Sequence, residues 1–123
     1  MAVKVVDASA IAAILFNEPD APKVVAAIAD DALVAPSLLA YELASVCLKK
    51  IRLHPDRHDL YRSAMLLLSR LDVQVDPVNM DAAVVLAAAT RLSVYDACYL
   101  WLARTLRAEL VTLDKQLAAA ARR

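Results

Sequence analysis

Short apolar runs alternate along this chain with longer segments in which apolar side chains recur three and four residues apart. The short runs predict strands at 2–6, 33–35, 73–75 and 109–112. The longer segments predict helices over 8–16, 22–29, 36–53, 55–71, 79–91, 93–107 and 114–123. Because helices separate the strands and no hairpin signal joins two of them, we expect an α/β fold, a parallel sheet covered by helices on both faces.

Prolines set several of the expected boundaries. Asn17 and Pro19 mark a break after the first helix. Pro22 suits the first turn of the second helix, where its missing N–H costs nothing. His54 should end the long third helix, because the residue before Pro55 is pushed away from helical geometry.

Length and composition predict one compact domain over 1–123. The chain is 61% hydrophobic and 23% charged, which is far from the disordered class. No uncharged apolar stretch reaches the roughly 18 residues that span a bilayer. Asp7 comes too early for a signal peptide. We therefore expect a cytoplasmic protein without a membrane anchor.

Charge and residue usage narrow the function classes. Lys plus Arg balance Asp plus Glu at 14 each, so net charge does not indicate a nucleic-acid binder, and the basic excess over 49–62 is typical of a solvated helix end and loop. Cys47 and Cys98 fall in apolar helical patterns and are expected as reduced, buried thiols. Glycine is absent, which excludes Walker and G-x-G-x-x-G phosphate loops.

Acidic residues are placed unusually for an apolar chain. Three of them stand alone in long uncharged runs, and a fourth closes the last strand. An isolated carboxylate taken from water needs a compensating cation, and no basic residue lies nearby in sequence. The carboxyl ends of parallel strands meet at one sheet edge, so these groups are expected to converge there on a divalent metal. The lone acids are Asp7 in 5–17, Glu42 in 32–48 and Asp96 in 92–103, and the fourth is Asp114.

Helix capping is the alternative explanation for three of the four. Asp7, Asp96 and Asp114 all lie near predicted helix N-termini, where carboxylates stabilise free N–H groups, and Ser93 with Asp96 matches an acidic capping pattern. Glu42 differs, because it is mid-helix and has no Lys or Arg three or four residues away. That difference favours the metal hypothesis.

Four segments hold the acidic residues in order along the chain: VVDASA at 5–10, PSLLAYELA at 36–44, LSVYDACYLWLA at 92–103 and LVTLDKQL at 110–117. Together these segments resemble the PIN domains, and among them the VapC-type toxins of bacterial toxin–antitoxin pairs. The resemblance implies a three-layer α/β/α fold with a short parallel sheet of four strands, the presence of a fifth being left open because the chain stops at Arg123. Glycines common in that family before the third acidic residue and before the last strand are absent.

The same resemblance implies an endoribonuclease dependent on Mg²⁺ or Mn²⁺, leaving 5′-phosphate and 3′-hydroxyl ends. It would act as the toxin of a type II pair, inhibited by a cognate antitoxin and usually homodimeric. The acidic quartet would serve as catalytic metal ligands, with Asp114 a ligand or an orienting group. Ser9 and Thr112 match hydroxyl positions near the metals, with a capping serine and a strand threonine as the alternative. A catalytically silent PIN-fold module that binds RNA or a partner is the competing function.

Other candidate residues give weaker evidence of a functional site. His54 and His58 have the spacing of a zinc pair, but Pro55 intervenes and no third ligand is evident, so we interpret them as solvated. Three aromatic residues of 93–107 are interpreted as core or dimer-interface side chains rather than a base-stacking platform. A further apolar face is assigned by family analogy to an antitoxin groove. The aromatic residues are Tyr95, Tyr99 and Trp101, and the groove residues are Leu60, Tyr61 and Met65.

Overall fold

A computed structural model describes residues 2–123. Four strands alternate with helices, as predicted. The strands are β1 Val3–Val6, β2 Ala32–Ala35, β3 Gln74–Val75 and β4 Glu109–Val111. The α-helices are α1 Ala8–Leu15, α2 Ala21–Ile28, α3 Leu38–Leu53, α4 His58–Leu66, α5 Met80–Thr90, α6 Val94–Leu106 and α7 Lys115–Ala121. Two 3₁₀ turns, η1 Pro55–Arg57 and η2 Leu67–Leu71, flank α4.

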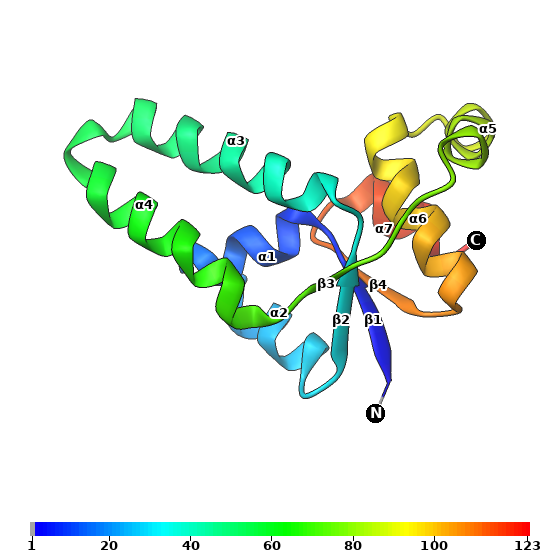
Figure 1. Cartoon of the computed structure of the whole chain (residues 1–123), viewed down its shortest axis with the longest axis horizontal. Coiled ribbons are helices and arrows are strands. Elements are labelled where there is room, and N and C mark those ends of the chain that lie inside the picture. Colours follow the sequence, from blue (N-terminus) through cyan, green and yellow to red (C-terminus); the bar gives the residue numbers. More distant parts are fainter. Residues whose placement is uncertain (1) are drawn as a thin grey trace.

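The strands form one parallel sheet in the order β3-β2-β1-β4. Strand β1 is central, and its Val5 lies opposite Val34 of β2 and Leu110 of β4. Helices α1 to α4 lie on one side of the sheet and α5 and α6 on the other (Figure 1). The predicted three-layer α/β/α fold is therefore confirmed. Within residues 2–123, no single helix is long and apolar enough to cross a membrane, although α5 and α6 pass that test as a pair bent by 107°.

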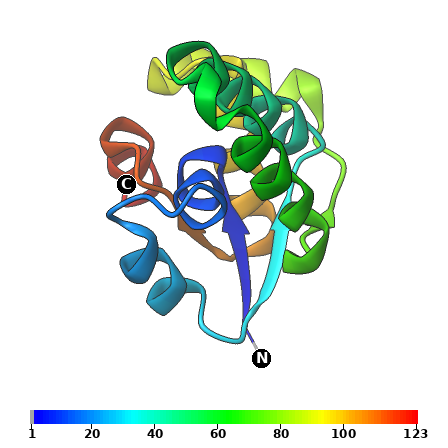
Figure 2. The same cartoon turned by 90° about the vertical axis from the view of Figure 1, so that its left-hand side faces the viewer.

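Apolar residues of β1 and of the helices beside it make the core. Val5 and Val6 are fully buried, because helices cover both faces of the central strand. Ile11 of α1 and Leu43 of α3 are also fully buried, and Figure 2 shows α1 in front of the strands with α3 and α4 beside it. The core thus fixes the start of α1, where Asp7 lies.

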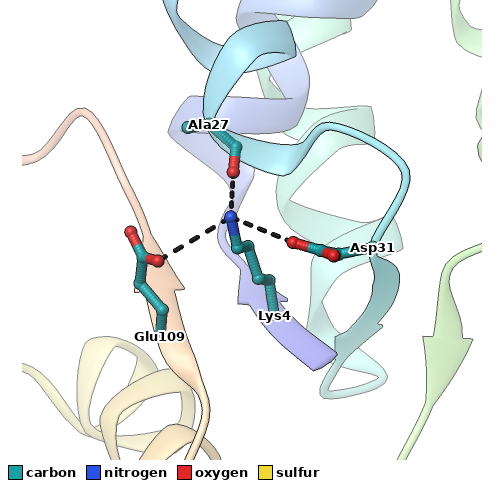
Figure 3. A network of polar contacts seen from close by, with 4 residues as sticks. All are labelled: Lys4, Ala27, Asp31 and Glu109. Atoms are coloured by element: carbon teal, nitrogen blue, oxygen red, sulfur yellow. Dashed lines mark hydrogen bonds and ion pairs between the residues drawn. The ribbon is translucent and has the colours of Figure 1, made fainter. Parts of the chain in front are cut away.

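The opposite end of β1 is tied by a lysine. The ammonium group of Lys4 lies 3.1 Å from a carboxylate oxygen of Asp31 and 3.7 Å from one of Glu109, and it donates to the carbonyl of Ala27 (Figure 3). These partners come from α2, from the approach to β2 and from β4. One half-buried cation therefore links three elements, and it offsets part of the charge of the two acids.

Helices end without glycine in this chain. Arg91 after α5 and Arg107 after α6 adopt left-handed conformations with φ of 64° and 53°. Glycine is the usual residue there, because a Cβ costs about 1–2 kcal/mol in that region. These are the helix ends before the third acidic residue and before the last strand. The backbone keeps the turn although arginine occupies it.

The segment predicted as one helix over 55–71 is broken, which corrects the sequence prediction. Only 58–66 is α-helical, and both flanks are 3₁₀ turns. His54 has an extended φ of −135° before Pro55, so the chain restarts with a tight turn. At the other end, Asp72 adopts a left-handed φ of 52° and terminates the segment. Hydrophobic periodicity does not distinguish such turns from a continuous helix.

Candidate functional site

Asp7 is the most deeply buried acid of the described chain. It follows β1 directly, caps α1 and is 4% exposed. Its Oδ1 accepts hydrogen bonds from the Ser9 hydroxyl at 2.7 Å and from the Ala10 N–H at 3.0 Å. Its Oδ2 accepts from the Thr112 hydroxyl at 2.5 Å. Groups from two strand ends thus hold this carboxylate in one orientation.

The two hydroxyls are themselves fixed by backbone groups. The Leu113 N–H donates to Ser9 Oγ at 2.8 Å, and the Asp114 N–H donates to Thr112 Oγ1 at 3.0 Å. A hydroxyl has a single proton, so each of the two donates a hydrogen bond to Asp7 and accepts one from a backbone N–H. Ser9 does not cap α1, because Asp7 does. Both hydroxyls lie against the predicted site, and their functional role stays a prediction.

Glu42 reaches the site from the middle of α3. It is half-buried, and its Oε1 accepts a hydrogen bond of 2.6 Å from the Tyr99 hydroxyl of α6. Tyr99 is only 1% exposed. A buried phenol normally finds a hydrogen-bond partner, which explains why this tyrosine and this glutamate pair across two helices. The glutamate therefore points to a tyrosine, not to a cation.

The carboxylates of Asp96 and Asp114 differ in their hydrogen bonds. The helix α6 is capped by Ser93, whose hydroxyl accepts from the Asp96 N–H at 3.1 Å. The Asp96 carboxylate accepts no hydrogen bond from the part of the chain that the structure describes. Asp114 is exposed and caps α7 by accepting from the Leu117 N–H at 2.8 Å. Capping therefore accounts for Asp7 and Asp114, but not for Asp96.

Burial and like charge act together on these carboxyls. Burial is the main reason that the pKa values of Asp7, Glu42 and Asp96 are raised above the ordinary range. Repulsion adds to it, from Asp114 on Asp7 and Asp96, and from Asp96 on Glu42. None of these acids is in an ion pair within residues 2–123. The four groups share one field of uncompensated negative charge.

The remaining lone pairs suit a hard cation. A carboxylate offers about four acceptor sites, and Asp7 uses two on Oδ1 and one on Oδ2, which leaves one on Oδ2. By the same count, Oε2 of Glu42 and both carboxylate oxygens of Asp96 accept no hydrogen bond within residues 2–123 and are free to bind a cation. No three His, Cys, Asp or Glu residues of 2–123 are arranged to hold one ion together. Mg²⁺ fits this set, because it commonly takes one or two carboxylates and keeps several waters.

Sequence reasoning missed the partner of Glu42. Tyr99 was interpreted only as a core or interface aromatic, although it follows Asp96 by one helical turn and a buried phenol needs an acceptor. Tyr95 is 62% exposed, whereas Trp101 is half-buried against the core. The histidines His54 and His58 are exposed, as expected.

The remaining predictions concern α4 and the cysteines. Of the residues assigned to an antitoxin groove, Leu60 is 61% exposed. Tyr61 packs edge-to-face on Phe16 at 6.1 Å between ring centroids, and Met65 packs on the core. Cys47 and Cys98 are free and buried, which confirms that prediction.

Comparison with known proteins places this geometry in a wider group. Residues 4–123 match the family described as PIN domain. Among solved structures, the crystal structure of PAE2754 from Pyrobaculum aerophilum is similar, with a TM-score of 0.74 and 29% sequence identity. The match covers 97% of this chain and 79% of that one. A search of curated proteins gave no match.

Proposed function

This chain belongs to the PIN domain family, and from that premise we propose that it is a metal-dependent endoribonuclease that hydrolyses RNA phosphodiester bonds. PIN domains are generally nucleases and generally use divalent metals. The family match does not identify the metal ligands, so the choice of individual residues is part of our proposal. We assign Asp7, Glu42 and Asp96 as the core metal ligands and Asp114 as a ligand or an orienting group. Because no three of these acids are arranged in residues 2–123 to hold one ion together, a bound ion would take one or two of the carboxylates and complete its shell with waters.

One observation carries the proposal. Three buried or half-buried carboxylates, those of Asp7, Glu42 and Asp96, lie in each other's field without a paired cation in the described residues. Such an arrangement is costly unless a cation binds there. Oxygen ligands without histidine or cysteine favour Mg²⁺ or Mn²⁺. A bound ion of this kind supplies Lewis acidity and an activated water for attack on a phosphodiester.

The chain's own residues orient that site. Three donors fix the Asp7 carboxylate, so its free lone pair on Oδ2 has a defined direction. Ser9 and Thr112 act here as orienting groups, because their protons are engaged with Asp7. Tyr99 holds one oxygen of Glu42 and leaves the other available. Pre-orientation of this sort lowers the cost of assembling a site around an ion and its waters.

Cleavage of single-stranded RNA by the purified protein tests the proposal. With Mn²⁺ present we expect hydrolysis that Asp7→Asn and Asp96→Asn each reduce by about a hundredfold or more. Asp81→Asn is the matched control, because Asp81 is exposed on α5 and its replacement removes the same charge. Activity that persists unchanged in the first two variants would refute the assignment. An inactive wild type that still binds RNA would favour the catalytically silent module instead.

The finer biological role is part of the same proposal. We place the protein in the cytoplasm as the toxin of a type II toxin–antitoxin pair, homodimeric and inhibited by a cognate antitoxin. Support comes from large apolar side chains exposed on two separate helical regions, since such groups commonly mark protein interfaces. Light scattering tests the dimer, and loss of growth on expression, rescued by a co-expressed neighbouring gene, tests the toxin role. The exposed residues are Leu53, Leu60 and Leu66 near α3 and α4 and Met80, Val84 and Val85 on α5.

A further inference from the structure

Asp96 is held in the candidate site only through the backbone. The Asp7 carboxylate accepts three hydrogen bonds and the Glu42 carboxylate accepts one, whereas the Asp96 carboxylate accepts none within residues 2–123. Asp96 lies in the first turn of α6, so its position depends on where that helix begins and in which direction it leaves the preceding turn. The residues that close the turn between α5 and α6 therefore decide where this carboxylate lies.

The turn between α5 and α6 is short and has no glycine. Only residues 91–93 connect the two helices, which are bent by 107° from each other (Figure 1). Arg91 adopts a left-handed φ of 64°, a conformation in which a Cβ is unfavourable, so other contacts must keep the turn closed. Helix α6 packs against β1, the strand that ends at Asp7. A change in the turn would therefore move Asp96 relative to Asp7.

The Thr90 hydroxyl bridges the two sides of this turn. It donates to the Leu86 carbonyl of α5 at 2.7 Å and accepts from the Leu92 N–H, beyond Arg91, at 3.4 Å. Leu92 is 6% exposed and belongs to the hydrophobic core, so the far side of the turn is anchored by packing. A threonine near a helix end often bonds only the carbonyl four residues earlier. The second bond, to Leu92, is what links this hydroxyl to the start of α6.

Ser93 continues the connection from Leu92 into α6. The Ser93 hydroxyl accepts from the Asp96 N–H at 3.1 Å, and the Ser93 carbonyl accepts from the Ala97 N–H at 2.9 Å. The backbone of Asp96 is thus held by the residue that follows the buried Leu92. Two side-chain hydroxyls and one core residue form an unbroken path from Thr90 to Asp96.

We propose that Thr90 is a positioning residue for Asp96, and that its hydroxyl keeps this carboxylate where a divalent ion beside Asp7 can bind it. This inference rests on the proposed function for the ion. Valine has the same shape as threonine but would leave the Leu92 N–H without an acceptor, which is costly for a buried group. The start of α6 would then shift to find another partner. A displacement of about 1 Å is enough to impair a site that depends on geometry.

Calorimetric titration of the full chain with Mn²⁺ tests this role. We expect Thr90→Val to lower the Mn²⁺ affinity by about tenfold, as loss of a group that orients a metal ligand commonly does. Ser93→Ala, which acts further along the same path, should also lower it. Thr90→Ser keeps the hydroxyl and should restore most of the affinity. Thr105→Val is the matched control, because it makes the same change at an exposed position of α6 and should leave the affinity at the wild-type value.

A double-mutant cycle separates positioning from a general loss of stability. If Thr90 acts through Asp96, Thr90→Val should have little further effect on Mn²⁺ affinity in the Asp96→Asn background, because the coupled group is already absent. In the Asp114→Asn background most of its effect should persist. Equal losses of affinity in the two backgrounds would overturn the inference, since a merely structural role does not distinguish these acids.

Amide hydrogen exchange of the metal-free protein in EDTA follows the turn itself. We expect the Leu92 amide to exchange about fivefold to tenfold faster in Thr90→Val, because it loses its acceptor, and the Asp96 amide to exchange faster as well. Thr90→Ser and Thr105→Val should resemble wild type. Amides of β1 exchange through global unfolding and show whether the change is confined to the turn.

Failure of this inference and failure of the proposed function give different results. If wild type binds Mn²⁺ and Thr90→Val binds it equally well, Thr90 does not position Asp96 and the metal site stands. An unchanged exchange rate at Leu92 and Asp96 in Thr90→Val, or a Thr90→Ser variant as weak as the valine variant, also overturns the inference. If wild type takes up no Mn²⁺, the proposed function is wrong and the role of Thr90 toward the ion is overturned with it, whatever the exchange rates show.

Discussion

Tyr99 is the residue whose contact adds most to the candidate site. Its hydroxyl is the one hydrogen-bond donor to Glu42 within residues 2–123, and it crosses from α6 to α3. Sequence patterns did not reveal this pair, because 57 positions separate the two residues and nothing local links them. The acid itself was predictable, since an isolated mid-helix glutamate without a nearby cation is rare.

Removing this hydroxyl should loosen the site without disrupting the core. We expect Tyr99→Phe to lower Mn²⁺ affinity by about tenfold, as loss of a partner that orients a metal ligand commonly does. It should also cost about 1 kcal/mol of stability, because Glu42 loses its donor. Calorimetric titration with Mn²⁺ measures the first effect and urea unfolding the second. Tyr95→Phe on the same helix is the control, since Tyr95 is exposed, and equal affinity in both variants would contradict the role given to Tyr99.

The raised carboxyl pKa values predict a pH effect on the metal-free protein. Asp96 has a pKa above its ordinary value of 3.8, mainly through burial, so the folded state binds a proton more tightly than the unfolded state. The contribution of this carboxyl to the free energy of unfolding is therefore fully present below the pKa of the unfolded state. It is lost as pH rises through the pKa of the folded state. In EDTA, Asp96→Asn should lose less stability than wild type between about pH 4 and pH 7. Urea unfolding across that pH range measures this difference, and the control variant Asp81→Asn should follow wild type. Parallel curves of stability against pH for wild type and both variants would contradict the prediction.

At the scale of elements, the glycine-free helix ends show how backbone geometry can override residue preference. Strand–helix alternation and a parallel sheet were predictable from periodicity and from the absence of hairpin signals, because both are local. The 3₁₀ turns around α4 were not, since apolar spacing is similar in the two helix types. Arg91 and Arg107 keep left-handed turns, because α5 packs against α6, and α6 packs against β1 and β4.

Relief of this backbone cost is measurable at Arg91. We expect Arg91→Gly to stabilise the protein by up to about 1 kcal/mol, because removal of the Cβ strain outweighs the extra freedom of glycine in the unfolded chain. Arg91→Ala keeps a Cβ and should leave stability near wild type. Urea midpoints of the two variants separate backbone strain from loss of the arginine side chain. A glycine variant no more stable than the alanine variant would show that the left-handed turn is not strained.

At the scale of the whole molecule, the fold brings four carboxylates from distant segments toward the ends of β1 and β4. Their general location was predictable, because the carboxyl ends of parallel strands share one edge. Their detailed arrangement was not, since Asp7 and Asp114 double as helix caps and Glu42 is held by Tyr99.

Anomalous diffraction from crystals grown with millimolar Mn²⁺ tests the central claim most directly. We predict a manganese peak at coordination distance, roughly 2.2 Å, from Oδ2 of Asp7 and from at least one oxygen of Glu42 or Asp96, with ordered waters completing the shell. Crystals of Asp7→Asn should lack that peak under the same conditions. A wild-type map with no manganese beside Asp7, in crystals whose solvent contains the ion, would contradict the account.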